Sequence, residues 1–120
     1  MNRSVDIQIK RAYVPASSED GTRVLVDRLW PRGVSKQKLQ AAWLKDVAPS
    51  GELRTWFGHR PERWAEFQHR YRAELDANPE AVAQLRRLLG HGRLTLVYGA
   101  RDELHNDAVV LRDYLLHPRD

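Results

Sequence analysis

The chain has 120 residues, of which 42% are hydrophobic and 30% charged, and this size and mixture predict a single globular domain over residues 1–120. It contains no cysteine, which excludes disulfides, a thiolate nucleophile and a cysteine-ligated metal. No apolar run approaches the roughly 20 residues that a membrane span needs. The N-terminal segment also lacks the apolar block of a signal peptide, so we expect a cytoplasmic protein without membrane contact.

The net charge of +4 is unevenly distributed along the chain. Residues 1–60 carry 11 Lys and Arg against 6 Asp and Glu, whereas residues 61–120 carry 9 against 10. A basic face suits anionic partners such as phosphates, nucleotides or nucleic acid. A solvated arginine-rich surface explains the same excess, so the charge by itself does not select a partner.

Three segments have the pattern of β-strands. Residues 5–11 alternate apolar and polar side chains, which indicates a strand with one wet face. Residues 22–27 and 93–97 have continuous apolar centres bounded by turn residues, which is typical of strands buried on both faces of a parallel sheet. Residues 41–48 are ambiguous and fit a short edge strand.

The remaining segments indicate helices, which end at glycine or before proline. In chain order we expect a short turn from Ser35 to Leu39, a helix from Pro49-Ser50 to Phe57, one beginning at Pro61, one over residues 79–89, and one beginning at Asp102 as its N-cap. Two of these helices carry an apolar stripe at helical spacing. The stripes are Trp64, Phe67, Tyr71 and Leu75 in one, and Leu104, Ala108, Leu111 and Leu115 in the other.

This order of elements predicts an α/β fold in which a small, largely parallel central sheet of about four strands is flanked by helices. In such sheets, ligands bind beyond the carboxyl ends of the strands. The loops that follow the two buried strands, after residues 27 and 97, are therefore the expected binding edge.

The first of these loops, DRLWPRGVS at residues 27–35, places a tryptophan between two arginines. Arginine suits carboxylate or phosphate because its guanidinium offers a fork of donors. We expect Arg28 and Arg32 to hold an anion and Trp30 to cover a flat ligand. In the alternative interpretation, Trp30 is a core plug and Arg28 pairs with a local acid such as Asp27.

The second loop, YGARDELHND at residues 98–107, follows the other buried strand. Gly99 allows close approach of a ligand to backbone N–H groups at a helix start, which form an anion cradle. Asn106 lies beside this cradle as a ligand-binding candidate. His105 is a candidate general acid or base near neutral pH, with Asp102 as its partner carboxylate. In the alternative interpretation, Asp102 only caps the helix and His105 is a satisfied boundary residue.

A third stretch, residues 53–64, adds Arg54 and His59, and His59 fits either a helix cap or a wall of the site. The five histidines lack the spacing of metal ligands on one helix, and no phosphate-loop, dinucleotide or nucleophile-elbow motif occurs. We therefore expect no metal and no cofactor.

Four ordered blocks of the chain resemble the bacterial family called domain of unknown function 488, in its YeaO-like branch. The blocks are DGTRVLVDRLWPRGVSK (20–36), AWLKDVAPSGELRTWFGH (42–59), FQHRYRAEL (67–75) and LVYGARDELHNDAVVL (96–111). The resemblance implies a small α/β domain with a central sheet, and it implies no established reaction. More distant branches carry a cysteine at the strand end and a Cys-His-Arg helix start, where this chain has Tyr98 and His105-Asn106.

Three functions remain open from the sequence. The first is action on a phosphorylated or nucleotide-like small molecule, by hydrolysis or group transfer, in a cleft at the carboxyl ends of the strands. The second is a nucleic-acid-binding or regulatory accessory domain, although no helix-turn-helix pattern is visible. The third is a non-catalytic protein-interaction module. The oligomeric state leaves no signal in the sequence.

Overall fold

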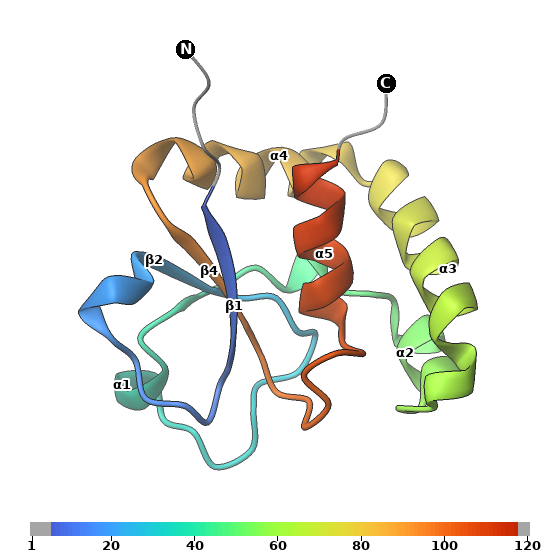
Figure 1. Cartoon of the computed structure of the whole chain (residues 1–120), viewed down its shortest axis with the longest axis horizontal. Coiled ribbons are helices and arrows are strands. Elements are labelled where there is room, and N and C mark those ends of the chain that lie inside the picture. The colour runs from blue at the N-terminus through green and yellow to red at the C-terminus, as the bar shows by residue number, and fades with distance from the viewer. Residues whose placement is uncertain (1–5, 118–120) are drawn as a thin grey trace.

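A computed structural model describes residues 6–117 and contains one parallel four-stranded sheet with helices around it (Figure 1). The strands are β1 (Ile7–Arg11), β2 (Thr22–Leu25), β3 (Ala42–Trp43) and β4 (Leu94–Tyr98). Their order across the sheet is β1-β4-β2-β3, and all three pairings are parallel. The predicted α/β fold with a small parallel sheet is confirmed.

The three predicted strands are present, and their burial follows their place in the sheet. All five residues of the central strand β4 are buried, as its continuous apolar sequence indicates. Those of the edge strand β1 are only partly buried, in line with their alternating pattern. Of the predicted segment 5–11, Val5 lies outside the described residues. The ambiguous segment 41–48 forms the two-residue strand β3 and then a 3₁₀ turn over Lys45–Val47.

The helices are α1 (Lys36–Leu39), α2 (Gly51–Phe57), α3 (Trp64–Asp76), α4 (Pro79–Leu88) and α5 (Asp107–Leu116). Ser35 and Ser50 cap α1 and α2, because each hydroxyl accepts a hydrogen bond from a backbone N–H of the first turn. Gly58 ends α2 with a left-handed φ of 52°, as its position predicts. Pro61 begins a 3₁₀ turn, Pro61–Arg63, that leads directly into α3.

The start of the last helix differs from the prediction. Helix α5 begins at Asp107 with Asn106 as its N-cap, and not at Asp102. Asn106 has extended backbone angles, and its side-chain oxygen accepts from the Val109 N–H at 3.0 Å. Asp102 instead caps a tight turn before the helix, where it accepts from the Leu104 and His105 N–H groups. Leu104 therefore lies outside the buried stripe and is 72% exposed.

The two faces of the sheet are covered differently. The larger hydrophobic core joins one face to α3, α4 and α5, and it includes Phe67, Tyr71 and Leu75 from the predicted stripe of α3. Figure 1 shows α5 and α3 beside the sheet and α4 across the end where β1 and β4 begin. The opposite face has a small cluster around Leu25 and Val97, which is covered by α1 and the loop that precedes it.

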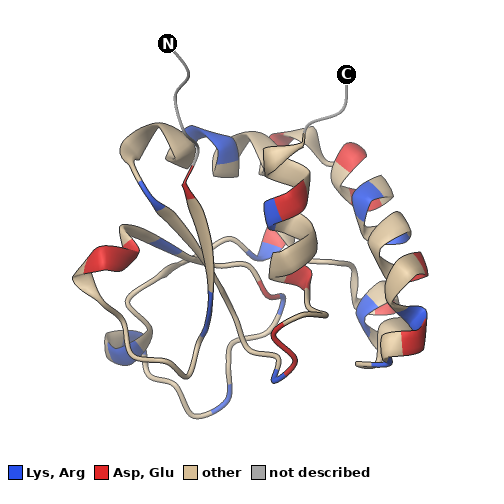
Figure 2. Ribbon diagram, in the orientation of Figure 1, with Lys and Arg blue, Asp and Glu red and all other residues tan. Residues whose placement is uncertain are grey.

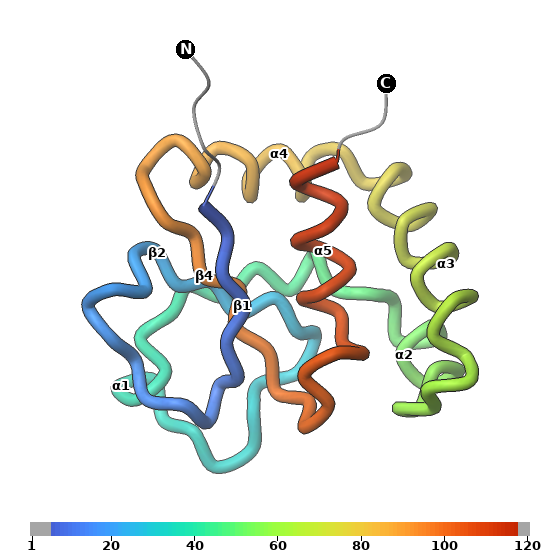
Figure 3. Tube along the Cα trace, viewed as in Figure 1, coloured from blue at the N-terminus to red at the C-terminus, as the bar shows by residue number. Residues whose placement is uncertain are grey.

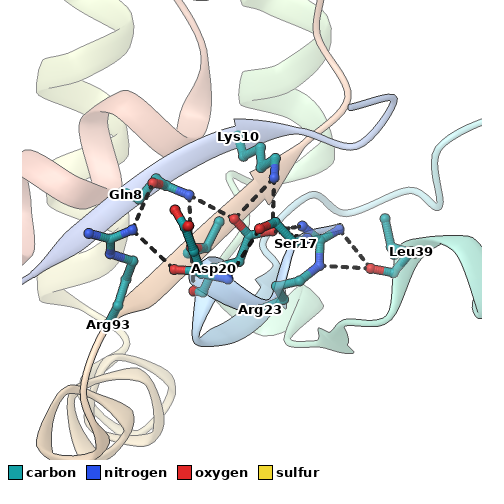
Figure 4. A network of polar contacts seen from close by, with 9 residues as sticks. Gln8, Lys10, Ser17, Asp20, Arg23, Leu39 and Arg93 are labelled. Carbon is teal, nitrogen blue, oxygen red and sulfur yellow. Dashed lines mark hydrogen bonds and ion pairs between the residues drawn. The ribbon is translucent and has the colours of Figure 1, made fainter. Parts of the chain in front are cut away.

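A buried polar network occupies the rest of that second face (Figure 4). Its centre is Asp20, which is 2% exposed and binds Lys10 at 2.9 Å and Arg23 at 2.8 Å. Arg23 also donates from Nε and Nη2 to the Leu39 carbonyl, which ties α1 to β2. Burial by itself raises the pKa of Asp20, but hydrogen bonds from Lys10, the Ser17 backbone, Arg23 and Gln8 outweigh burial and lower that pKa to about 2.

The loops at the carboxyl ends of β2 and β4 meet at one edge of the molecule. Figure 3 shows the chain after β2 and the chain between β4 and α5 at the same lower end of the fold. The Gly99 N–H donates to Asp27 Oδ2 at 2.8 Å, and a Cβ placed on Gly99 lies 3.9 Å from Pro31 Cβ. The predicted convergence of the two loops is therefore present.

No helix within residues 6–117 has the length and apolar character needed to cross a membrane.

Candidate functional site: a charged cleft at the strand ends

A cavity of about 480 Å³ lies where these two loops meet the end of α2. Its walls combine apolar side chains with a small number of charged ones, which is the usual make-up of a ligand pocket. The carboxyl, guanidinium and imidazole side chains are those of Asp27, Arg28, Arg54, His59, His105 and Asp107. The apolar ones include Leu29, Pro31, Pro49 and Phe57.

Five of the seven predicted site residues line this cavity. They are Arg28, Trp30, Gly99, His105 and Asn106. Arg32 and Asp102, both described by the structure, are not among the lining residues. Arg32 is exposed, and its backbone carbonyl accepts from the Tyr13 hydroxyl at 3.0 Å. Asp102 contributes indirectly, through its contact with His105.

Arg28 has a fixed position at the cleft. It is partly buried, and its Nε donates to the Pro49 carbonyl at 3.1 Å. Within residues 6–117, its two terminal nitrogens form no hydrogen bond and no ion pair. The guanidinium is thus anchored on one side and free to bind on the other.

Trp30 is held by the protein itself. Its indole N–H donates to the Val34 carbonyl at 2.6 Å, and its ring meets that of Trp43 edge-on, with 5.4 Å between centroids. It also packs against the small cluster on the second face of the sheet. The ring therefore forms a fixed wall of the cavity and also packs against the protein interior. It has features of both interpretations of the sequence, the ligand-covering one and the core-filling one.

His105 is oriented by Asp102. Its Nδ1 lies 2.8 Å from Asp102 Oδ2, and its ring meets Trp64 edge-on at 5.1 Å between centroids. The hydrogen bond from the Leu104 N–H, followed by that from the His105 side chain, lowers the pKa of Asp102. This leaves Nε2 as the ring nitrogen available for proton transfer.

Gly99 and Asn106 have structural partners at the cleft. The Gly99 N–H is used by Asp27, so a carboxylate of the protein occupies the backbone position expected to receive a ligand anion. Asn106 uses its amide oxygen to cap α5 and its amide nitrogen to donate to the Asp102 carbonyl at 2.9 Å. Both residues therefore build the cleft.

Two carboxyl groups, Asp27 and Asp107, form a hydrogen-bonded pair in the cavity. Asp27 ends the segment that continues β2, and Asp107 is the first residue of α5. Burial, followed by the charge of Asp27, raises the pKa of Asp107 well above its ordinary value. Burial also raises the pKa of Asp27, against the hydrogen bonds from Asp107 and Gly99 and the charges of His59 and Arg54. The raised pKa of Asp107 favours its protonated form, in which it is the donor to Asp27.

The buried hydroxyl of Tyr71 donates to the Val47 carbonyl. Burial, together with the nearby charges of Asp107 and Asp27, raises the pKa of Tyr71 well above its ordinary value. The phenol is therefore a neutral member of the hydrophobic core.

The sequence reasoning missed the carboxyl pair. From the sequence, Asp27 is expected only as a partner of Arg28, and Asp107 is expected inside a helix, because the predicted N-cap Asp102 lies four positions before the observed N-cap Asn106. One usable signal was present: each acid follows the carboxyl end of a buried strand, directly in one case and after a loop in the other. Within the described chain, no group of acids and histidines is arranged to hold a metal ion.

A family model described as the inactive DUF488-N3 subclade matches residues 6–120 of this chain. The chain belongs to this family. An uncharacterised protein of Mycobacterium tuberculosis strain H37Rv is similar to it, with 43% identity over 116 residues, or 96% of this chain and 98% of the relative.

The uncharacterised protein YeaO of Escherichia coli K12 is 42% identical to this DUF488-N3 chain over 112 residues, which cover 92% of this chain and 97% of YeaO. These matches confirm the resemblance to the YeaO-like branch. No solved structure matches the chain.

Proposed function

We propose that this DUF488-N3 protein binds a phosphorylated or nucleotide-like small molecule in the cleft at the strand ends. The observation that supports this proposal most directly is that two cationic side chains, Arg28 and Arg54, and the imidazole of His59 line one cavity. Across residues 6–117, no hydrogen bond or ion pair engages the Arg54 guanidinium, and Arg28 uses only its Nε. Donors left unused beside a cavity favour an anion as the ligand.

The apolar walls add to the expected affinity for such an anion. Leu29, Pro31, Pro49 and Phe57 line the cavity beside the cations and reduce the contact of a bound phosphate with water. Charge-assisted hydrogen bonds are stronger in such surroundings than on an open surface. Along α3 and α5, Arg residues are interspersed with Asp and Glu (Figure 2).

Hydrolysis or group transfer on the bound ligand is the second candidate function, and the Asp27–Asp107 pair supports it. A carboxyl group with a raised pKa beside an ionised one serves as a general acid and base pair. His105, oriented by Asp102, is the other proton-transferring group on the cavity. The family description "inactive" favours ligand binding without turnover, so binding is the primary proposal.

Isothermal titration with inorganic phosphate, ribose 5-phosphate and adenosine monophosphate tests the binding proposal. We expect at least one of these ligands to bind, and we expect Arg54→Gln to weaken it roughly 10- to 100-fold because one charge-assisted contact is lost. Arg60→Gln is the matched control, since Arg60 is also an exposed arginine near the end of α2 but lies outside the cavity lining. The proposal fails if no ligand binds, or if Arg54→Gln binds as the unaltered protein does.

The same samples separate the remaining alternatives. Phosphorus NMR of the ligand after prolonged incubation reports turnover. If the His105→Gln and Asp107→Asn variants still form the product, neither side chain takes part in the chemistry. Short DNA and RNA duplexes, titrated at low salt, test the nucleic-acid function that the sequence left open.

A further inference from the structure

The cavity has a second chemical character that phosphate binding does not use. Beside Arg28, Arg54 and His59 lies the Asp27–Asp107 pair, whose members both line the cavity. The two carboxyl groups are hydrogen-bonded to each other, so a ligand in this space meets their oxygens. A ligand that fills the cavity therefore meets cations at one part of its surface and hydrogen-bond acceptors at another.

We infer that the ligand is a phosphate ester that carries free hydroxyl groups, as in a polyol phosphate or sugar phosphate, and that these hydroxyls bind the Asp27–Asp107 pair. This inference rests on the proposed phosphate binding and deepens it. It names the part of the ligand that lies away from the phosphate.

The first argument is that the pair retains acceptor capacity. An ionised carboxylate offers about four lone-pair sites, and a protonated carboxyl keeps part of that capacity. The protein uses some of these sites: the Gly99 N–H donates to Asp27 Oδ2, and Asp107 forms a hydrogen bond with Asp27. Hydroxyl donors of a ligand can fill sites that remain on the cavity side.

The second argument selects a neutral donor over a cation. The charges of His59 and Arg54 already act on Asp27, and both side chains line the same cavity as Arg28. An ammonium group placed at the pair meets these like charges, whereas a hydroxyl carries no charge to repel. Leu29, Pro31 and Phe57 also offer contacts for the carbon skeleton of a polyol.

Three small ligands of similar length test the inference: glycerol 3-phosphate, propyl phosphate and O-phosphoethanolamine. Isothermal titration on the unaltered protein should give a dissociation constant for glycerol 3-phosphate roughly 10- to 100-fold lower than for propyl phosphate, because only the former donates to the carboxyl pair. O-phosphoethanolamine should bind more weakly than glycerol 3-phosphate.

The outcomes separate this inference from the proposed function. If glycerol 3-phosphate and propyl phosphate bind equally well, the hydroxyl inference is overturned while phosphate binding stands. If O-phosphoethanolamine binds best, the pair selects a cation and the inference is again overturned. If none of the three binds and inorganic phosphate does not bind either, the proposed function itself fails.

A variant locates the preference at the pair. Asp27→Asn replaces an ionised acceptor by an amide, so the preference for glycerol 3-phosphate over propyl phosphate should fall to within about threefold. Asp46→Asn, at an exposed acid outside the cavity lining, should leave the preference unchanged. An undiminished preference in Asp27→Asn overturns the inference. The ligand comparison on the unaltered protein decides the matter even if this variant does not fold.

Discussion

Gln40 and His59 are the two residues other than glycine with a positive φ among residues 6–117. Gln40, at φ 48°, ends α1, and His59, at φ 57°, directly follows the left-handed Gly58 at the end of α2. An L side chain in this region costs about 1 kcal/mol relative to glycine. Only His59 lines the cavity. Because strained residues are frequent at binding sites, this backbone supports a ligand-contacting role for the imidazole.

We expect His59→Gly to raise the free energy of unfolding by up to about 1 kcal/mol, since glycine adopts this φ without strain. The same change should weaken phosphate binding roughly tenfold by removing one donor from the cavity. Gln40→Gly is the matched control: it relieves a similar φ away from the cavity and should leave affinity unchanged. Urea unfolding and isothermal titration measure both effects, and unaltered affinity in His59→Gly excludes the imidazole from the site.

The turn before β2 is the element that fixes the sheet to the polar network. Gly21 ends the 3₁₀ turn at Ser18–Asp20 with φ 65° and ψ −131°, a combination that side chains rarely adopt. A Cβ at this position lies 2.3 Å from the Arg93 carbonyl oxygen, which itself accepts from the Thr22 N–H. The backbone of the turn therefore touches the chain that enters β4, and a larger residue has no room.

Gly21→Ala should lower the free energy of unfolding by at least about 2 kcal/mol, because it combines a disfavoured backbone conformation with a contact against main chain. The control is Gly90→Ala, where an added Cβ meets no atom within 4 Å and the backbone angle is ordinary. That variant should change stability by less than about 1 kcal/mol. Urea unfolding of the two variants measures the difference, and equal effects would contradict the steric explanation.

At the level of elements, much of the fold was predictable from local patterns. The stripe of α3 and the apolar run of β4 identify their elements because burial on one or two faces leaves a periodicity that a sequence displays. The start of α5 was not predictable in this way. Asp102 and Asn106 are both good N-cap residues, and the choice between them depends on contacts of the folded loop.

The candidate site was predictable only in its position. The strand-end rule predicts Arg28, Gly99 and His105 at one edge of the sheet, and all three line one cavity. The carboxyl pair depends on how far the end of β2 lies from the start of α5. That separation is set by the insertion of β4 beside β2, which is a long-range pairing with no local signature.

For the whole molecule, two groups of acids have opposite effects on how the free energy of unfolding changes with pH. The folded pKa of Asp20, about 2, is below its unfolded value, so its contribution is present above pH 4 and is lost as the pH falls toward 2. The pKa values of Asp27 and Asp107 are raised by burial, so the protonated pair stabilises the fold at low pH. That contribution is lost as the pH rises through the raised values.

Urea unfolding from pH 2 to pH 9 should therefore show a free energy of unfolding that is highest at an intermediate pH. It should fall toward low pH (the acid limb) and also toward high pH. Asp20 accounts for about 2 kcal/mol of the acid limb. Asp20→Asn should flatten that limb and should also destabilise the protein at pH 7 by about 3 kcal/mol, because it leaves Lys10 and Arg23 without their shared carboxylate. Asp107→Asn should flatten the other limb. If Asp20→Asn loses as much stability at low pH as the unaltered protein does, groups other than Asp20 cause that loss.

The strand order β1-β4-β2-β3 also governs how the chain can assemble during synthesis. The ribosome delivers β1 and β2 early, yet neither pairs with the other, since β4 lies between them and pairs with both. Until Leu94–Tyr98 has emerged, β1 has no strand partner and the apolar stripe of α3 has no completed sheet to cover it. A nascent chain that stalls before this strand therefore exposes the unpaired strand β1 and apolar helix faces, which are the features that chaperones bind.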